Sequence, residues 1–309
     1  MRRFGKVFGA LTLAVVLAAF FAPQAHATTI KDLQDAISAL QATVSNQTAQ
    51  ISALQQTIAN QAADLDGIKN SNVMTLDPYL TVDLNDINGM KGPHVIFTGA
   101  NVHIRSGSGG TGEYPLTGHG NLVIGYNEPR LDNSGYPDTS ERGGSHNLVI
   151  GQSHKYSSYG GLVAGLANTI SGLYASACGG IGNMASGDNS SVSGGVGNIA
   201  SGIFASISAG GWNTASGSYS NVSAGRYNTA SGPWSSVTGG ENNTASGDYS
   251  SVSGGGSNTA SGDSSNLGAS VSGGWNNTAS GGGSNVSGGY NRNAIGEYDW
   301  AAGSLFEDQ

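Results

Sequence analysis

The sequence is poor in cysteine and in charge. Its one cysteine, Cys178, among 309 residues excludes an intramolecular disulfide, so stability must come from repetition or association. Charged residues make up 10% of the chain, Lys and Arg are scattered, and the formal net charge is -8. Because nucleic-acid binding needs clustered positive charge, this balance indicates that no nucleic acid is a partner.

Groups suited to catalysis are also few. Between residues 161 and 290 the charged residues are Asp188, Arg226, Glu241, Asp248 and Asp263. They are spread along the chain, whereas polysaccharide-active β-helix enzymes need paired carboxylates or clustered basic residues in a groove. No two of the following histidines have a standard metal-ligand spacing: His94, His103, His119, His146 and His154. We therefore expect no enzymatic activity, cofactor or metal site, and a polysaccharide-active protein is the weakest alternative.

The N-terminus has the pattern of an export signal. Arg2, Arg3 and Lys6 surround the start of the apolar stretch "VFGALTLAVVLAAFFA", and "AHA" at 25–27 is a small-x-small cleavage site. The apolar stretch is shorter than the ~20 residues that a membrane span needs, which disfavours an uncleaved anchor. We predict a Sec-type signal peptide at 1–27 and a protein at the cell surface or outside the cell, without a transmembrane anchor.

A heptad pattern follows and predicts a coiled-coil stalk at 28–70. Its core positions are Ile30, Leu33, Ile37, Leu40, Val44, Gln47, Ile51, Leu54, Ile58, Gln61, Leu65 and Ile68. Such an apolar seam can be buried only by another copy or by a partner, so the chain is expected to be oligomeric. β-branched residues alternating with Leu favour dimers, while Gln47 and Gln61 are polar core residues that specify register and stoichiometry.

Residues 71–119 have the composition of a β connector. Alternating apolar residues predict strands from Leu80 to Leu84 and at Val95 to Ile104, with turn residues at Gly99 and Asn101. The segment "DLNDING" at 83–89 offers oxygen ligands for calcium, but its spacing does not match an EF-hand loop. We interpret it as a turn beside strands.

The remainder is a tandem repeat. Degenerate copies at 120–166 contain "NLVIG" twice, separated by a polar loop, and regular copies occupy 167–296. One asparagine recurs every 15 residues and then once four residues late: Asn168, Asn183, Asn198, Asn213, Asn228, Asn243, Asn258 and Asn277. Two glycine-ended strands per period predict an all-β parallel β-solenoid or β-roll. Residues 297–309, with Trp300, Leu305 and Phe306, are expected to cap the last coil.

Strand alternation predicts which side chains fill a coil. In the copy at 213–227, Ala215, Val222 and Ala224 are expected to point inward, and Gly217 and Gly225 to lie at sharp turns or close approaches. This inward set is small, so a lone coil buries little apolar surface against the entropy of ordering its chain. Three coils side by side would bury more, which favours a homotrimeric coaxial fibre.

The repeats resemble a known family. The pair "SVSGG" and "NTASG", and more closely "NLVIG" at 121–125 and 147–151, is similar to the head repeats of trimeric autotransporter adhesins. The resemblance covers roughly residues 120 to 300 and, in general plan, the stalk. It implies parallel β-rolls, three to a trimer, in a fibre for adhesion or matrix and filament formation, with a glycan or a cell surface as ligand. The sequence departs from that family in two ways: the period is longer than is common in those heads, and the stalk precedes the head with no C-terminal membrane anchor expected. Self-translocation and membrane anchoring are therefore not carried over.

Two periodic ladders offer alternatives for the surface. Aromatic residues share one position of the repeat: Tyr174, Phe204, Tyr219, Trp234 and Tyr249. They could stack from coil to coil or form an exposed platform for glycans or fibre packing. Four threonines, each followed two residues later by serine, form an outward array typical of ice-binding solenoids: Thr214, Thr229, Thr244 and Thr259. Met184 and Ile199 interrupt that array, so a single-chain ice-binding solenoid is the alternative function.

Overall fold

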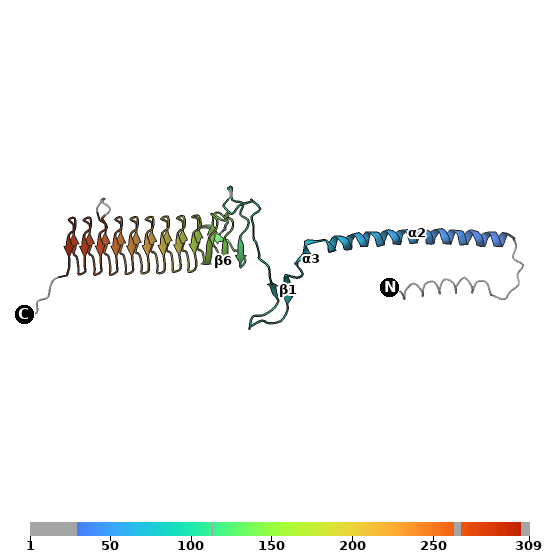
Figure 1. Cartoon of the computed structure of the whole chain (residues 1–309), viewed down its shortest axis with the longest axis horizontal. Coiled ribbons are helices and arrows are strands. Elements are labelled where there is room, and N and C mark those ends of the chain that lie inside the picture. Colours follow the sequence, from blue (N-terminus) through green and yellow to red (C-terminus); the bar gives the residue numbers. More distant parts are fainter. Residues whose placement is uncertain (1–29, 113, 263–266, 304–309) are drawn as a thin grey trace, which may run out of the picture. The chain divides into compact units, whose positions relative to one another are not determined.

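The computed structural model describes residues 30–112, 114–262 and 267–303 (Figure 1). The predicted signal peptide, and Leu305 and Phe306 of the predicted cap, lie outside the described residues. The chain divides into two compact units between Asn101 and Val102.

The N-terminal unit contains a long helix, α2 (Ile30–Lys69), and a short one, α3 (Asn72–Leu76). The predicted helix is therefore confirmed, and at 1.5 Å per residue α2 is about 60 Å long. Neither helix buries a residue, and the apolar heptad positions are exposed, from 50% at Ile37 to 82% at Ile30. Among the described residues, no helix combines the length and apolarity needed to cross a membrane.

A β-hairpin completes this unit. β1 (Leu80–Asp83) pairs antiparallel with β2 (His94–Phe97), with Leu80 opposite Phe97. The predicted turn between them is confirmed, since the Asn85 N–H donates to the Asp83 carboxylate at 2.9 Å. The predicted strand at Val102 and Ile104 is wrong. Gly99, with φ 68°, turns the chain after β2, and the described residues form no further strand before Leu122.

The C-terminal unit is a parallel β-solenoid of two sheets. The first sheet has twelve strands: β3 (Leu122–Ile124), β6 (Leu148–Gln152), β8 (Leu162–Leu166), β10 (Ser176–Ala177), β12 (Ser191–Val192), β14 (Ser206–Ile207), β16 (Asn221–Val222), β18 (Ser236–Val237), β20 (Ser251–Val252), β22 (Ser270–Val271), β24 (Asn285–Val286) and β26 (Trp300–Ala301). The second sheet has ten: β7 (Lys155–Tyr156), β9 (Thr169–Ile170), β11 (Met184–Ala185), β13 (Ile199–Ala200), β15 (Thr214–Ala215), β17 (Thr229–Ala230), β19 (Thr244–Ala245), β21 (Thr259–Ala260), β23 (Thr278–Ala279) and β25 (Asn293–Ala294). The chain alternates between the sheets, so each coil contributes one strand to each (Figure 1).

Strand register confirms the 15-residue period. Thr229 is paired with Thr244, and Ser236 with Ser251. The four extra residues of the late copy lie between β21 and β22, because β20 pairs with β22 at an offset of 19 residues. The loop at 126–145 is likewise an excursion between paired strands, since β3 and β6 lie side by side, and it carries the small hairpin of β4 (Arg130–Leu131) and β5 (Pro137–Asp138).

The interior of each coil differs in part from the predicted one. Ala215 and Val222 are fully buried, as expected, but Ala224 is only half-buried. Ala224 lies beyond the end of β16, where strand alternation no longer applies. Ser220 and Asn228 point inward instead and are 1% and 0% exposed. Each coil is thus filled by small apolar and polar side chains together.

The recurring asparagine forms a buried ladder along the solenoid. In one rung the backbone N–H of Asn228 donates to Oδ1 of Asn213 at 2.9 Å, and Oδ1 of Asn228 accepts the N–H of Asn243 at 3.0 Å. Its Nδ2 donates to the carbonyls of Ala224, in the same coil, and Gly240, in the next, at 3.1 and 2.9 Å. The side chain therefore satisfies backbone groups of its own coil and of the next, and the backbone N–H binds the asparagine of the preceding coil, which fixes the register of three successive coils.

Two glycine columns are required by this close stacking. A Cβ on Gly217 would collide with the backbone carbonyl of Gly232 one coil away. Gly225 has a φ of 93°, and a Cβ there would meet both the Gly240 carbonyl and Nδ2 of Asn228. The column of Gly217 is required because the next coil approaches its backbone closely. The column of Gly225 is required both by such an approach and by its positive φ. Both requirements were predicted from the sequence.

We expect Asn228→Ala to lower the free energy of unfolding by about 1–3 kcal/mol, because the Asn243 N–H loses its acceptor inside the solenoid. Urea unfolding followed by circular dichroism measures the loss. The matched control is Ser231→Ala, which changes an exposed residue of the same coil and should change the midpoint little. Equal midpoints for the two variants would contradict the role of the ladder.

Candidate interaction surfaces

The aromatic ladder lies along one edge of the solenoid, at the turn between the second sheet and the first. Ring centroids are 4.9 Å apart for Phe204 and Tyr219, 5.4 Å for Tyr219 and Trp234, and 5.0 Å for Trp234 and Tyr249. The planes are within 12° of parallel. Tyr174 is separated from this stack by the coil of Asn189 and meets Tyr159 edge-on instead.

This geometry bears on what the ladder can bind. Tyr219 and Trp234 each have a ring on both sides, so their faces are covered and mainly their edges meet solvent, although each side chain is about half exposed (49% and 50%). A sugar ring stacks on an open aromatic face. The arrangement therefore favours stacking from coil to coil over a glycan platform along the ladder.

A second aromatic column on the opposite edge was missed by the sequence analysis. Trp212 and Tyr227 stack at 5.5 Å, and the guanidinium of Arg226 lies 4.9 and 4.6 Å from their ring centroids. The backbone of both residues has a positive φ, 51° at Trp212 and 56° at Tyr227, as does that of the residues in the first ladder. The spacing of 15 residues between Trp212 and Tyr227 was the signal available in the sequence.

The threonine array is in register on the second sheet. Thr214, Thr229, Thr244, Thr259 and Thr278 are paired in succession. Their side chains are half-buried. The array ends at Ile199, which pairs with Thr214 and places an apolar residue on the same face. The extent of the array is thus five consecutive strands.

An apolar patch covers the first coils of the solenoid. It consists of the outward residues of β3, β6 and β8, namely Leu122, Ile124, Leu148, Ile150 and Leu162. All three residues of β3 are exposed, while Val149 and Val163 point inward and are fully buried. In the following coil the corresponding position is Ser176. The outer face of the first sheet is therefore apolar near its N-terminal edge, and at the other edge the exposed Trp300 of β26 occupies the same column.

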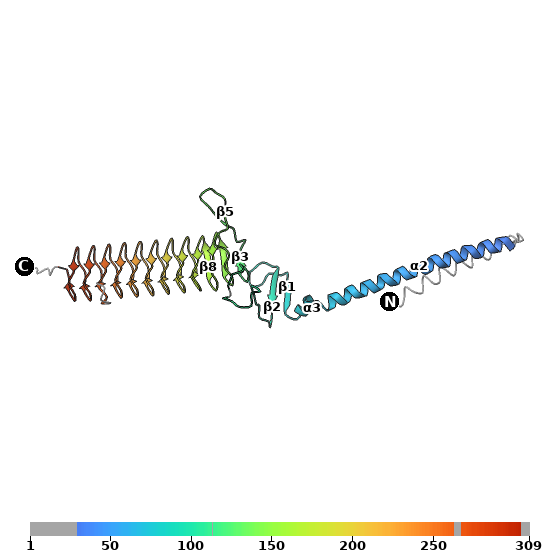
Figure 2. The same cartoon turned by 90° about the horizontal axis from the view of Figure 1, so that it is seen from above.

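The loop at 126–145 is held against these coils, from whose side it extends in Figure 2. Arg142 donates to the carbonyls of His154, Asn127 and Glu128. Lys155 pairs with Asp138 at 2.9 Å, and the Ser140 hydroxyl together with Lys155 lowers the pKa of Asp138 to about 2. The loop thus has defined anchors and leaves aromatic side chains such as Tyr136 exposed.

His154 begins the asparagine ladder. It is fully buried, its Nδ1 accepts the Asn168 N–H at 3.1 Å, and its Nε2 lies 3.0 Å from the Ile150 carbonyl. These contacts require the neutral ring with the proton on Nε2. Burial lowers the pKa of His154 below its usual value, and the nearby positive charge of Arg130 lowers it further.

Stability should therefore fall in mild acid. His154 has a lower pKa in the folded chain than in the unfolded chain, so its contribution is complete above the ordinary value of 6.5 and is lost as pH falls below it. His154→Asn, which places the residue of the other rungs at this position, should weaken the dependence of the urea midpoint on pH between 7.5 and 5.5. The exposed His119→Asn is the control. A dependence that His154→Asn leaves intact would contradict this assignment.

Over the described ranges, no three His, Cys, Asp or Glu side chains are grouped so that they could hold a metal ion. Cys178 is exposed just after β10, in the column of Ser193. No model of a known protein family matches the chain, and comparison with the curated proteins gives no match. The function must therefore be inferred from the surfaces themselves.

Proposed function

We propose that the protein is an exported homotrimeric fibre that acts in surface attachment or in building extracellular matrix or filaments. The observation that carries the proposal is the heptad seam of α2, which is exposed along all 40 residues of the helix. An isolated helix with this seam in water would leave its apolar stripe unburied. Association with copies of the same chain buries the stripe and gives the fibre its stalk.

The solenoid supports self-association independently. The outer face of its first sheet carries the apolar patch on β3, β6 and β8, where a soluble monomer would carry polar residues. The patch lies on regular strands, so several chains can pack it against one another through the same residues. A second copy is therefore the partner that this face fits.

The stoichiometry of three rests on the repeats. They resemble the heads of trimeric autotransporter adhesins, in which three β-rolls form a trimer, and the observed parallel solenoid supports that likeness. The 15-residue period and the order of helix before solenoid are departures from that family. The small interior of each coil favours the same arrangement, because chains packed side by side bury a second face. Export through the predicted signal peptide places the fibre outside the cell.

Light scattering coupled to size exclusion tests the assembly. We expect three chains per particle, or multiples of three. Replacing the seam residues Ile51 and Leu54 by aspartate should reduce the particle to one chain, because three like charges cannot be buried together at one level of a coiled coil.

The control places the same two charges on the other side of the helix, at Ala49 and Gln56, and should leave the particle mass unchanged. Circular dichroism checks that both variants keep their solenoid. A wild-type particle of one chain would overturn the proposal, and a particle of two would overturn its stoichiometry.

The threonine array favours ice binding as a second candidate. Five threonines in register on one sheet, with a serine two residues after each, present a regular hydroxyl surface. If this surface binds ice, the protein will show thermal hysteresis that Thr244→Lys abolishes, since a long charged side chain interrupts the middle of the array. No hysteresis at millimolar protein would rule this candidate out.

A further inference from the structure

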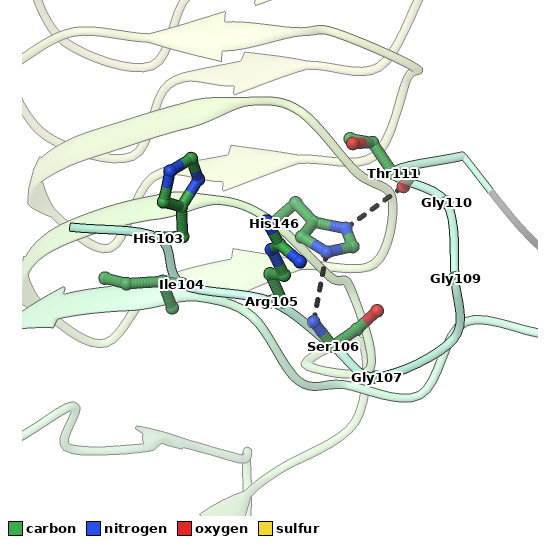
Figure 3. A pocket seen from close by; sticks show the side chains of 9 residues that line it. All are labelled: His103, Ile104, Arg105, Ser106, Gly107, Gly109, Gly110, Thr111 and His146. Carbon is green, nitrogen blue, oxygen red and sulfur yellow. Dashed lines mark hydrogen bonds between the residues drawn. The ribbon is translucent and has the colours of Figure 1, made fainter. Parts of the chain in front are cut away.

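A cavity of about 520 Å³ lies near the start of the solenoid unit, between the segment 103–111 and His146 (Figure 3). It is lined by a loop rich in glycine and serine, "RSGSGG" at 105–110, with His103 and Ile104 before it and Thr111 after it. The volume is in the range of ordinary ligand sites.

His146 holds this loop in place. Its Nε2 accepts the backbone N–H of Ser106 at 3.2 Å, and its Nδ1 lies 3.0 Å from the carbonyl of Thr111. Because Nε2 accepts a hydrogen bond, the ring proton is on Nδ1, where it is donated to Thr111. Figure 3 shows both bonds reaching from one ring to the two ends of the loop. The cavity therefore has a fixed wall.

The described lining of the cavity offers donors and carries no carboxylate. Arg105 lines it, and the described residues supply no hydrogen-bond or ion-pair partner for its guanidinium. The backbone N–H groups of Gly107, Gly109 and Gly110 likewise have no acceptor among the described residues. Among the described residues that line it there is no aspartate or glutamate, and Glu113 lies outside the described residues. The guanidinium and these N–H groups belong to residues that line one cavity, and donors of these two kinds bind oxyanions in proteins.

We propose that this cavity binds a carboxylate or sulfate group of an acidic polysaccharide, an inference that rests on the proposed role as an extracellular fibre. Arg105 pairs with the anion and the glycine N–H groups donate to its oxygens. The cavity is much larger than a single oxyanion, and the Ser106 and Thr111 side chains and backbone carbonyls of its wall suit sugar hydroxyls. Because the protein carries a net charge of -8, general electrostatic attraction would not draw a polyanion to it. Binding of an acidic polymer would therefore depend on this local site.

Titration calorimetry of the full chain with three polymers tests the site: polygalacturonate for carboxylate, heparin for sulfate and dextran as the uncharged control. We expect binding of polygalacturonate, heparin or both, and none of dextran. Arg105→Gln should weaken binding about ten- to hundredfold, because it removes a charge-assisted pair. Arg226→Gln, which removes an arginine from the edge of the shaft, should bind as the wild type does.

Three results would overturn the inference: no binding of either acidic polymer, equal affinity for dextran, or equal losses in the two arginine variants. The particle mass, measured on the same samples, separates this inference from the proposed function. Trimers that fail to bind the acidic polymers would contradict the site alone. Single chains that bind through Arg105 would contradict the fibre and leave the site standing.

Discussion

The asparagine ladder is the constraint on which the solenoid depends. Each rung joins the backbone of its own coil to the coils before and after it, so strands of only two residues can stack in register. The same stacking brings carbonyl groups so close to the two glycine columns that a side chain would not fit. It also brings equivalent aromatic residues to the spacing of adjacent strands, about 4.8 Å, at which Tyr219 and Trp234 must stack.

This way of filling the interior has a consequence for the outside. A coil that is filled by alanine, serine, asparagine and one valine contains little apolar surface. Its asparagine side chain is satisfied by neighbouring coils, whereas the buried hydroxyl of Ser220 has no hydrogen-bond partner among the described residues. Apolar side chains that could be buried elsewhere remain at the surface, on α2 and on the outer positions of β3, β6 and β8. The repeats therefore supply a regular shaft, while these exposed surfaces supply the contacts from which a fibre is built.

The period, the helix and the two strands per coil could be predicted because each follows from spacing alone. Asn228 marked the period in the sequence, but its place inside the coil could not be predicted, because asparagine is usually a turn residue and burial here depends on partners in other coils. The inward placement of Ala224 was wrong for a related reason: alternation holds only within the two-residue strand. The cavity around Arg105 depends on His146, which is distant in sequence and carried no motif.

Native-state amide hydrogen exchange tests the ladder most directly. The backbone N–H groups of the asparagines from Asn183 to Asn277 donate to the preceding asparagine and are fully buried. They should be the slowest to exchange and should be equally protected in successive coils. The amides of the half-exposed turn residues Tyr219 and Tyr227, which donate to backbone carbonyls one coil away, should exchange faster. Asparagine amides that exchange as fast as those turn amides would contradict the account.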